Sequence, residues 1–153
     1  MATTRLSRTI RAPRDVIYRA LIDPAAVQQW MVPDGMTSHV HAFDAREGGT
    51  FRISLTYEDP AADGKTSAHT DTFHGAFVEL LPGSKVVQVI EFESDDPTMQ
   101  GEMTVSYVLT EHPDGTERVG VHENVPAGVS PSANEVGWSM PIGKLAALVE
   151  THA

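Results

Sequence analysis

Two histidines spaced two residues apart, His39 and His41, are the first side chains whose spacing could serve chemistry. Residues two apart in a strand point to the same side, so the two imidazoles could hold a metal ion with a third ligand. Zinc sites use three or four protein ligands, and no third residue follows at a matching spacing. We therefore expect no metal site.

The neighbours His122 and Glu123 have the residue types of a general acid and a general base. Adjacent residues of a strand point to opposite faces, however, so the two side chains cannot act together directly. The sequence has no pattern of a nucleophilic serine, a phosphate-binding loop or a dinucleotide-binding loop, and it has no cysteine. It therefore identifies no catalytic residue and no cofactor.

The composition narrows the range of partners. The 153 residues include 11 Lys and Arg against 21 Asp and Glu, a formal net charge of -10. An acidic surface repels phosphate backbones and anionic lipids, so we expect neither nucleic acid nor a membrane surface as a partner. No segment resembles a signal peptide or approaches the length of a membrane span, and we expect a cytoplasmic protein.

A strand, two short helices, six further strands and a long helix are expected in that order. Residues 5–11 alternate as a strand does. Pro13 and Pro24 each suit the first turn of a helix, and Asp23 suits the N-cap of the second. After residues 32–35 the apolar period changes from helical to two. The six expected strands are 37–44, 49–58, 72–81, 84–93, 102–111 and 116–124.

The last helix, expected over about 132–150, carries one apolar stripe. Its members are Trp138, Ile142, Leu145 and Val149. Consecutive strands favour an antiparallel sheet, and this helix is the only long element available to cover one face of it. We expect a single domain over residues 1–153. Pro141 lies inside the stripe and predicts a kink, which either opens the mouth of a cavity or fits the helix to a curved sheet.

Four segments resemble a known family. They are RAPRDVIYRALIDPAAVQQWMVP (11–33), FDAREGGTFR (43–52), FHGAFVELLPGSKVV (73–87), and TERVGVHENVP with NEVGWSMPIGKLAALVE (within 116–150). The chain resembles the START-like (SRPBCC) superfamily and, within it, the bacterial homologues of the activator of heat-shock protein 90 ATPase. The resemblance implies an α+β helix-grip fold, also called START-like or Bet v 1-like. In that fold a curved antiparallel sheet of six to seven strands, with two short helices after the first strand, wraps round a long C-terminal helix.

The resemblance also implies a cavity between sheet and helix that takes apolar or amphipathic small molecules. The strands 49–58 and 102–111 each turn one apolar face to the helix, and a buried Tyr57 or Tyr107 would need a hydrogen-bond partner. The ordinary alternative is that these side chains fill a core. The candidate ligand-binding residues are Trp30, Phe51, Ile53, Leu55, Tyr57, Phe77, Glu91, Val105, Tyr107, Arg118, His122, Trp138, Met140 and Ile142.

Strand 116–124 supports two different registers. Its periodicity places Val119 and Val121 inside and leaves Arg118 and His122 exposed, which is the usual environment of arginine. The family pattern places Arg118 and His122 inside instead, where they would need an anionic or polar partner. Glu91 or an acidic group of a ligand could supply it.

Three functions fit these observations, and we expect them in this order. The first is a small-molecule binding protein without enzymatic activity. The second is an enzyme of cyclase, hydratase or hydrolase type that uses His122 or a tyrosine as general acid or base. The third is an interaction protein that modulates a chaperone ATPase. The expected partner is thus a small hydrophobic or amphipathic ligand, with a homodimer and a chaperone contact left open.

Overall fold

The computed structural model describes residues 2–32, 35–58, 70–94, 96–128 and 131–151. For Ala2, residues 131–138, Met140 and Thr151 the description covers the backbone alone. The predicted positions of the Trp138 and Met140 side chains therefore lie outside the described residues.

Seven strands form one antiparallel sheet in the order β1-β7-β6-β5-β4-β3-β2. The strands are β1 (Ala2–Ile10), β2 (Met36–Phe43), β3 (Thr50–Tyr57), β4 (Thr70–Leu81), β5 (Lys85–Phe92), β6 (Met103–His112) and β7 (Gly115–Val125). Strands β2 to β7 follow one another in sequence, and β1 pairs with β7. All seven predicted strands are present, and the sheet is the antiparallel one that the sequence predicts.

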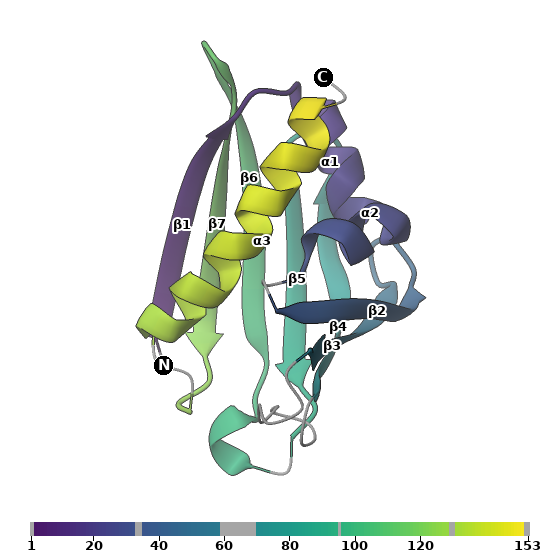
Figure 1. The fold of residues 1–153 in the computed structure, drawn as a ribbon, viewed down its shortest axis with the longest axis vertical. Helices are drawn as coiled ribbons and strands as arrows, with labels where there is room; N and C mark the ends of the chain where they lie inside the picture. Colours follow the sequence, from purple (N-terminus) through teal and green to yellow (C-terminus); the bar gives the residue numbers. More distant parts are fainter. Residues whose placement is uncertain (1, 33–34, 59–69, 95, 129–130, 152–153) are drawn as a thin grey trace.

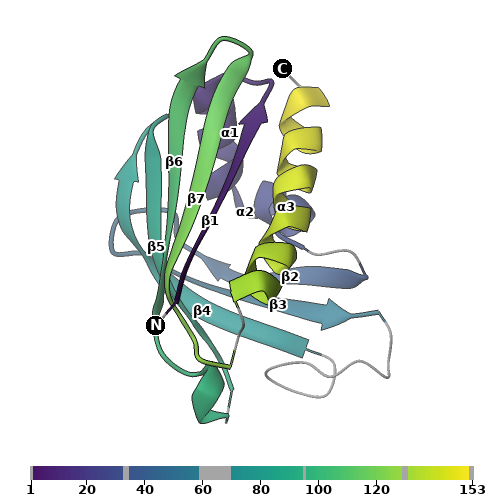
Figure 2. The same cartoon turned by 90° about the vertical axis from the view of Figure 1, so that its left-hand side faces the viewer.

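The sheet is strongly curved. In Figure 2, β2, β3 and β4 run nearly crosswise to β1, β6 and β7. Irregular pairing in β2 between Val40 and Ala42, and in β4 between Phe77 and Glu79, contributes to the bend, because a bulge turns its strand. The curvature gives the sheet an inner face, which packs against the helices, and an outer face.

Three helices cover the inner face (Figure 1). They are α1 (Arg14–Ile22), α2 (Pro24–Trp30) and α3 (Pro131–Thr151), and a 3-10 turn, η1 (Pro97–Met99), joins β5 to β6. Asp23 caps α2 as predicted, since its side chain accepts a hydrogen bond from the Ala25 amide at 3.0 Å. Within the described ranges no helix is long and apolar enough to cross a bilayer.

The C-terminal helix α3 lies obliquely across the sheet beside β1, α1 and α2 (Figure 1). It continues through Pro141 without interruption. Ile142, Leu145 and Val149 are buried, as the predicted stripe requires. This arrangement is the α+β helix-grip architecture, with the two short helices placed directly after the first strand.

Candidate functional site

The inner face of β7 carries polar side chains. The prediction from periodicity, that Arg118 and His122 are exposed, is wrong. The Arg118 side chain is 1% exposed and His122 is 3% exposed. Their partners across the β6–β7 ladder are Leu109 and Val105, which belong to the buried face of β6. Directly opposite residues in an antiparallel pair share a face, so the ladder places Arg118 and His122 inside. Alternation within the strand could not reveal this, because Val119 is buried as well.

Arg118 lies against Tyr107 of β6. The guanidinium carbon is 4.7 Å from the centre of the tyrosine ring, a cation–π contact. Gly120 makes room for it, because a Cβ atom at that position would lie 3.0 Å from Arg118 Nη1. A flat aromatic neighbour on β6 and a glycine two residues along β7 therefore set the position of the charge.

The polar atoms of this pair are buried and only partly satisfied. In the described part of the chain, Arg118 Nε, Arg118 Nη1 and the Tyr107 hydroxyl have no hydrogen-bond partner. Burial raises the pKa of Tyr107 to about 12, although the charge of Arg118 opposes the shift. Burial also lowers the pKa of Arg118. An unpaired buried charge is costly, so these atoms are the strongest sign of a missing partner on the inner face.

Trp30 also packs against Tyr107. The two rings meet edge to face with centroids 6.5 Å apart. The indole Nε1 of Trp30 donates to the carbonyl of Ala20 at 2.8 Å, which ties the end of α2 to α1. Trp30 is completely buried and already hydrogen-bonded. It therefore acts as a wall of the interior and has no free donor for a ligand.

A row of residues crosses the inner face beside Arg118. Gln88 of β5, Val105 of β6, His122 of β7 and Thr4 of β1 are successive partners in the ladders. All four are buried. The sequence analysis did not select Gln88 or Thr4. Both faces of β5 carry valines, so the pattern does not reveal that Gln88 lies inside.

The far half of the inner face is aromatic. The rings of Phe51 and Phe77 have centroids 5.3 Å apart, and Phe43 and Phe73 pack against them. Ile53 is buried with this group, while Leu55 and Tyr57 are half-buried. The inner face thus carries its buried polar side chains mainly on β7 and an aromatic cluster on β3 and β4.

Glu91 is not on the inner face, and the prediction that it could pair with Arg118 is wrong. Glu91 alternates with the buried residues Gln88 and Ile90 along β5 and turns outward. One carboxylate oxygen accepts from the Gly101 amide at 2.9 Å, and the other lies 3.7 Å from His74 Nε2. Its partners therefore belong to the outer face.

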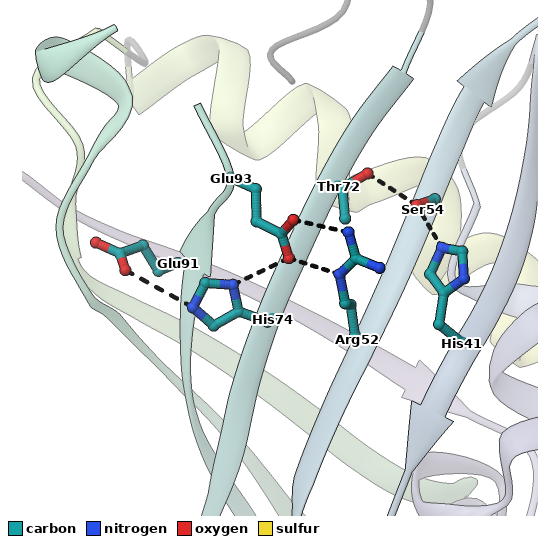
Figure 3. A network of polar contacts seen from close by, with 7 residues as sticks. All are labelled: His41, Arg52, Ser54, Thr72, His74, Glu91 and Glu93. Carbon is teal, nitrogen blue, oxygen red and sulfur yellow. Dashed lines mark hydrogen bonds and ion pairs between the residues drawn. The ribbon is translucent and has the colours of Figure 1, made fainter. Parts of the chain in front are cut away.

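The outer face carries a separate polar network (Figure 3). Arg52 donates two hydrogen bonds to Glu93, at 2.8 and 2.9 Å, and His74 Nδ1 lies 3.1 Å from the same carboxylate. The hydrogen bond from Arg52 is the main reason that the pKa of Glu93 falls to about 2. The charge of Arg52 is thus balanced by that of Glu93. This arrangement is typical of an ion pair that stabilises a sheet.

His39 and His41 also lie on the outer side. Their ring centroids are 4.5 Å apart, and His41 Nε2 is 2.7 Å from Ser54 Oγ. Burial, followed by the neighbouring His39, lowers the pKa of His41. Among the residues that the structure describes, no group of three His, Cys, Asp or Glu side chains could hold a metal ion.

Two adjoining surface hollows, of about 570 and 640 Å³, lie where α1 begins and the β6–β7 turn ends. Their walls include Pro13, His112 and Gly115. They contain none of the predicted ligand-binding residues. The unsatisfied polar atoms lie instead on the inner face, and we take that face as the candidate site.

A curved antiparallel sheet that grips a C-terminal helix, with polar groups buried on its inner face, defines a START-like, helix-grip protein. The sequence profile described as "Activator of Hsp90 ATPase homolog 1-like protein" matches residues 11–150. The chain therefore belongs to the family of that description.

Solved structures agree with this assignment. A protein from Chromobacterium violaceum is 32% identical, with a TM-score of 0.86 over 97% of this chain and 96% of the other. A protein from Rhodobacter sphaeroides shares the fold at 18% identity, with a TM-score of 0.79 over 97% and 93% of the two chains. An AHSA1-like protein from Aeromonas hydrophila shares it at 15% identity, with a TM-score of 0.72 over 99% and 94%. No functionally curated protein matches the sequence.

Proposed function

We propose that the protein binds one small, largely apolar or amphipathic molecule between the inner face of the sheet and α3. The observation that carries the proposal is a set of buried donors that have no hydrogen-bond partner among the described residues, namely Arg118 Nε, Arg118 Nη1 and the Tyr107 hydroxyl. Buried polar groups are normally satisfied, so a site that leaves three donors open is suited to a ligand. The aromatic half around Phe51 and Phe77 supports the same proposal, because it offers an apolar surface to the rest of the molecule.

Titration with N-phenyl-1-naphthylamine, a neutral dye that fluoresces in apolar surroundings, tests this function. We expect saturable binding of one dye per chain, with energy transfer from the tryptophans. A ligand that binds only the folded state adds about 2.7 kcal/mol of stability at one hundred times its dissociation constant. The thermal midpoint should therefore rise with dye concentration.

The exposed side chains Val78 and Leu81, 54% and 46% exposed, provide the control. They are the large apolar side chains on the described surface at which a dye could bind nonspecifically. A Leu81→Ser variant should bind the dye as the wild type does. Binding that does not saturate, or that disappears in Leu81→Ser, would contradict an interior site.

An enzymatic role is the second candidate, and the position of His122 favours it. The imidazole is buried on the inner face in the same row as Gln88. Histidine is the residue that most often serves as a general acid or base in enzymes. Tyr107 stays protonated at neutral pH and is a second candidate for the acid. Conversion of a bound compound that is lost in His122→Asn, with unchanged dye affinity, would establish a cyclase-like or hydrolase-like activity.

A contact with a chaperone ATPase is the third candidate, and membership of the family supports it. The relevant measurement is the ATPase rate of purified heat-shock protein 90 with and without this protein. A rate that does not change, together with no binding in a pull-down, would remove this candidate. Neither result affects the proposal of a small-molecule site.

A further inference from the structure

We infer that the molecule bound on the inner face carries an acidic group, such as a carboxylate, and that this group sits on Arg118. The inference rests on the proposed function and specifies the chemical class of the ligand. It starts from the immediate surroundings of one side chain and from the contrast with another arginine of the same sheet.

The described neighbours of Arg118 offer it no negative charge. Across the ladders its partners are Leu109 on β6 and Arg8 on β1. On the same face of β7 its neighbours are Gly120 and Thr116, and the Thr116 hydroxyl donates to the carbonyl of Ala12 at 2.7 Å. Leucine and glycine are apolar, the threonine hydroxyl is occupied, and a second arginine adds positive charge. An anion is the partner that this environment lacks.

Arg52, which has a counter-ion in Glu93, provides a comparison with Arg118. Arg52 lies on the outer face of β3, is about half exposed, and still makes two hydrogen bonds to Glu93. Arg118 is far more buried and, in the described residues, leaves Nε and Nη1 without acceptors. Because desolvation strengthens an ion pair in the interior, the buried arginine should be the better paired of the two. The observed contrast points to an acceptor that the described residues do not provide.

The surroundings of Arg118 indicate which of its atoms an acid would meet. The Tyr107 ring contacts the guanidinium, and Gly120 lies close to Nη1. The free donors Nε and Nη1 remain, and charge-assisted hydrogen bonds from a guanidinium to a carboxylate are strong. Arg8, which lies opposite Arg118 in the β1–β7 register, raises the positive potential further.

Acidic residues whose side chains lie outside the described part of the chain require a test of their own. Glu135 belongs to α3, and its side chain lies outside the described residues. If Glu135 neutralised Arg118, no acid on the ligand would be required. The experiment must therefore separate an internal counter-ion from an anionic ligand.

The test uses decanoate and decan-1-ol, which share a ten-carbon chain and differ in charge, as competitors of N-phenyl-1-naphthylamine at pH 7.5. We expect the wild type to bind decanoate at least about tenfold more tightly than decan-1-ol, the ratio that one charge-assisted hydrogen bond supplies. Arg118→Met should lose this preference and keep its affinity for decan-1-ol. Arg118→Lys should keep part of it, because the charge remains while the planar donor set is lost.

Arg5→Met is the matched control. Arg5 is an exposed arginine of β1 that pairs with Val121 of β7, and it lies on the outer face of the sheet. It should bind both competitors as the wild type does. Equal wild-type affinities for decanoate and decan-1-ol would overturn the inference and leave the proposed function intact. A preference that persists in Arg118→Met, or that arises only in Glu135→Gln, would also overturn it. Absence of saturable binding by the dye and both competitors would overturn the proposed function and the inference together.

Discussion

At the scale of single residues, Arg118 and Gly120 form a unit that a sequence pattern does not reveal. Arg118, which stands between Glu117 and Val119 in an alternating segment, resembles a residue of the exposed face of a strand. The ladder with β6 reverses that assignment by pairing Arg118 with Leu109, and Gly120 gives the long side chain room to lie flat. The resemblance to a family did carry the correct register, because the motifs of a family retain tertiary contacts that local periodicity lacks.

Gly120→Ala should displace the guanidinium, because the new methyl group would lie 3.0 Å from Nη1. We expect a loss of about 1–3 kcal/mol in the free energy of unfolding, the usual effect of overpacking a filled interior. Urea denaturation measures it. The matched control is Gly143→Ala in α3, where the added Cβ would lie 3.9 Å from Arg8 Nη1 and where alanine should stabilise the helix by about 0.5–1 kcal/mol. Similar effects of the two substitutions would contradict the steric account.

The Arg52–Glu93 pair predicts a pH dependence of stability. The pKa of Glu93 is lowered from 4.5 to about 2 in the folded protein, chiefly by the hydrogen bond from Arg52. A carboxyl with a lowered pKa stabilises the fold above its unfolded pKa, and this stabilisation is lost as the pH falls from about 4.5 to about 2.

Arg52→Met should therefore lower the free energy of unfolding at pH 7 and leave it nearly unchanged at pH 2. Urea denaturation at the two pH values measures the difference. Arg46→Met is the control, because Arg46 forms its ion pair with Asp44 at a more exposed position. A cost of Arg52→Met that is the same at both pH values would show that the methylene stem, rather than the charge, matters.

At the scale of elements, α3 holds the inner face closed through a few buried side chains. The sequence predicted this helix from its stripe, and Ile142, Leu145 and Val149 are buried as expected. Helical spacing reveals which side of a helix is apolar, so the contact of α3 with the sheet could be anticipated. The position of Gln88 could not, since β5 carries valines on both faces and its alternation does not show which face is buried.

Leu145→Ala should destabilise the fold by about 2–5 kcal/mol, because Leu145 is fully buried and its removal leaves a cavity under α3. Leu148→Ala is the control in the same helix, since Leu148 is only half-buried, and its effect should be clearly smaller. Denaturation by urea gives both values. Equal losses would indicate that α3 packs differently from the arrangement described.

At the scale of the whole molecule, the order of elements carried most of the information about the fold. One strand, two proline-led helices, six alternating segments and one long amphipathic helix leave few arrangements other than a sheet around a helix. Element bounds were less accurate: β1 begins at Ala2, ahead of the predicted residue 5, and β4 begins at Thr70, ahead of residue 72. The turn η1 carried no clear signal. What the sequence could not specify was the pairing of β1 with β7, because contacts between distant segments leave no mark in local periodicity.

That pairing has a consequence for biosynthesis. Among the described strands, β1 is synthesised before the other six, whereas β7 (Gly115–Val125), with which it pairs, is synthesised last. Until β7 is synthesised, the backbone N–H and C=O groups on both edges of β1 have no partner strand. In this state β1 segments of separate nascent chains can pair and aggregate. Arg5 and Arg8 interrupt the strand with positive charge, and like charges repel an identical strand from another chain. We therefore expect the arginines of β1 to oppose aggregation of nascent chains.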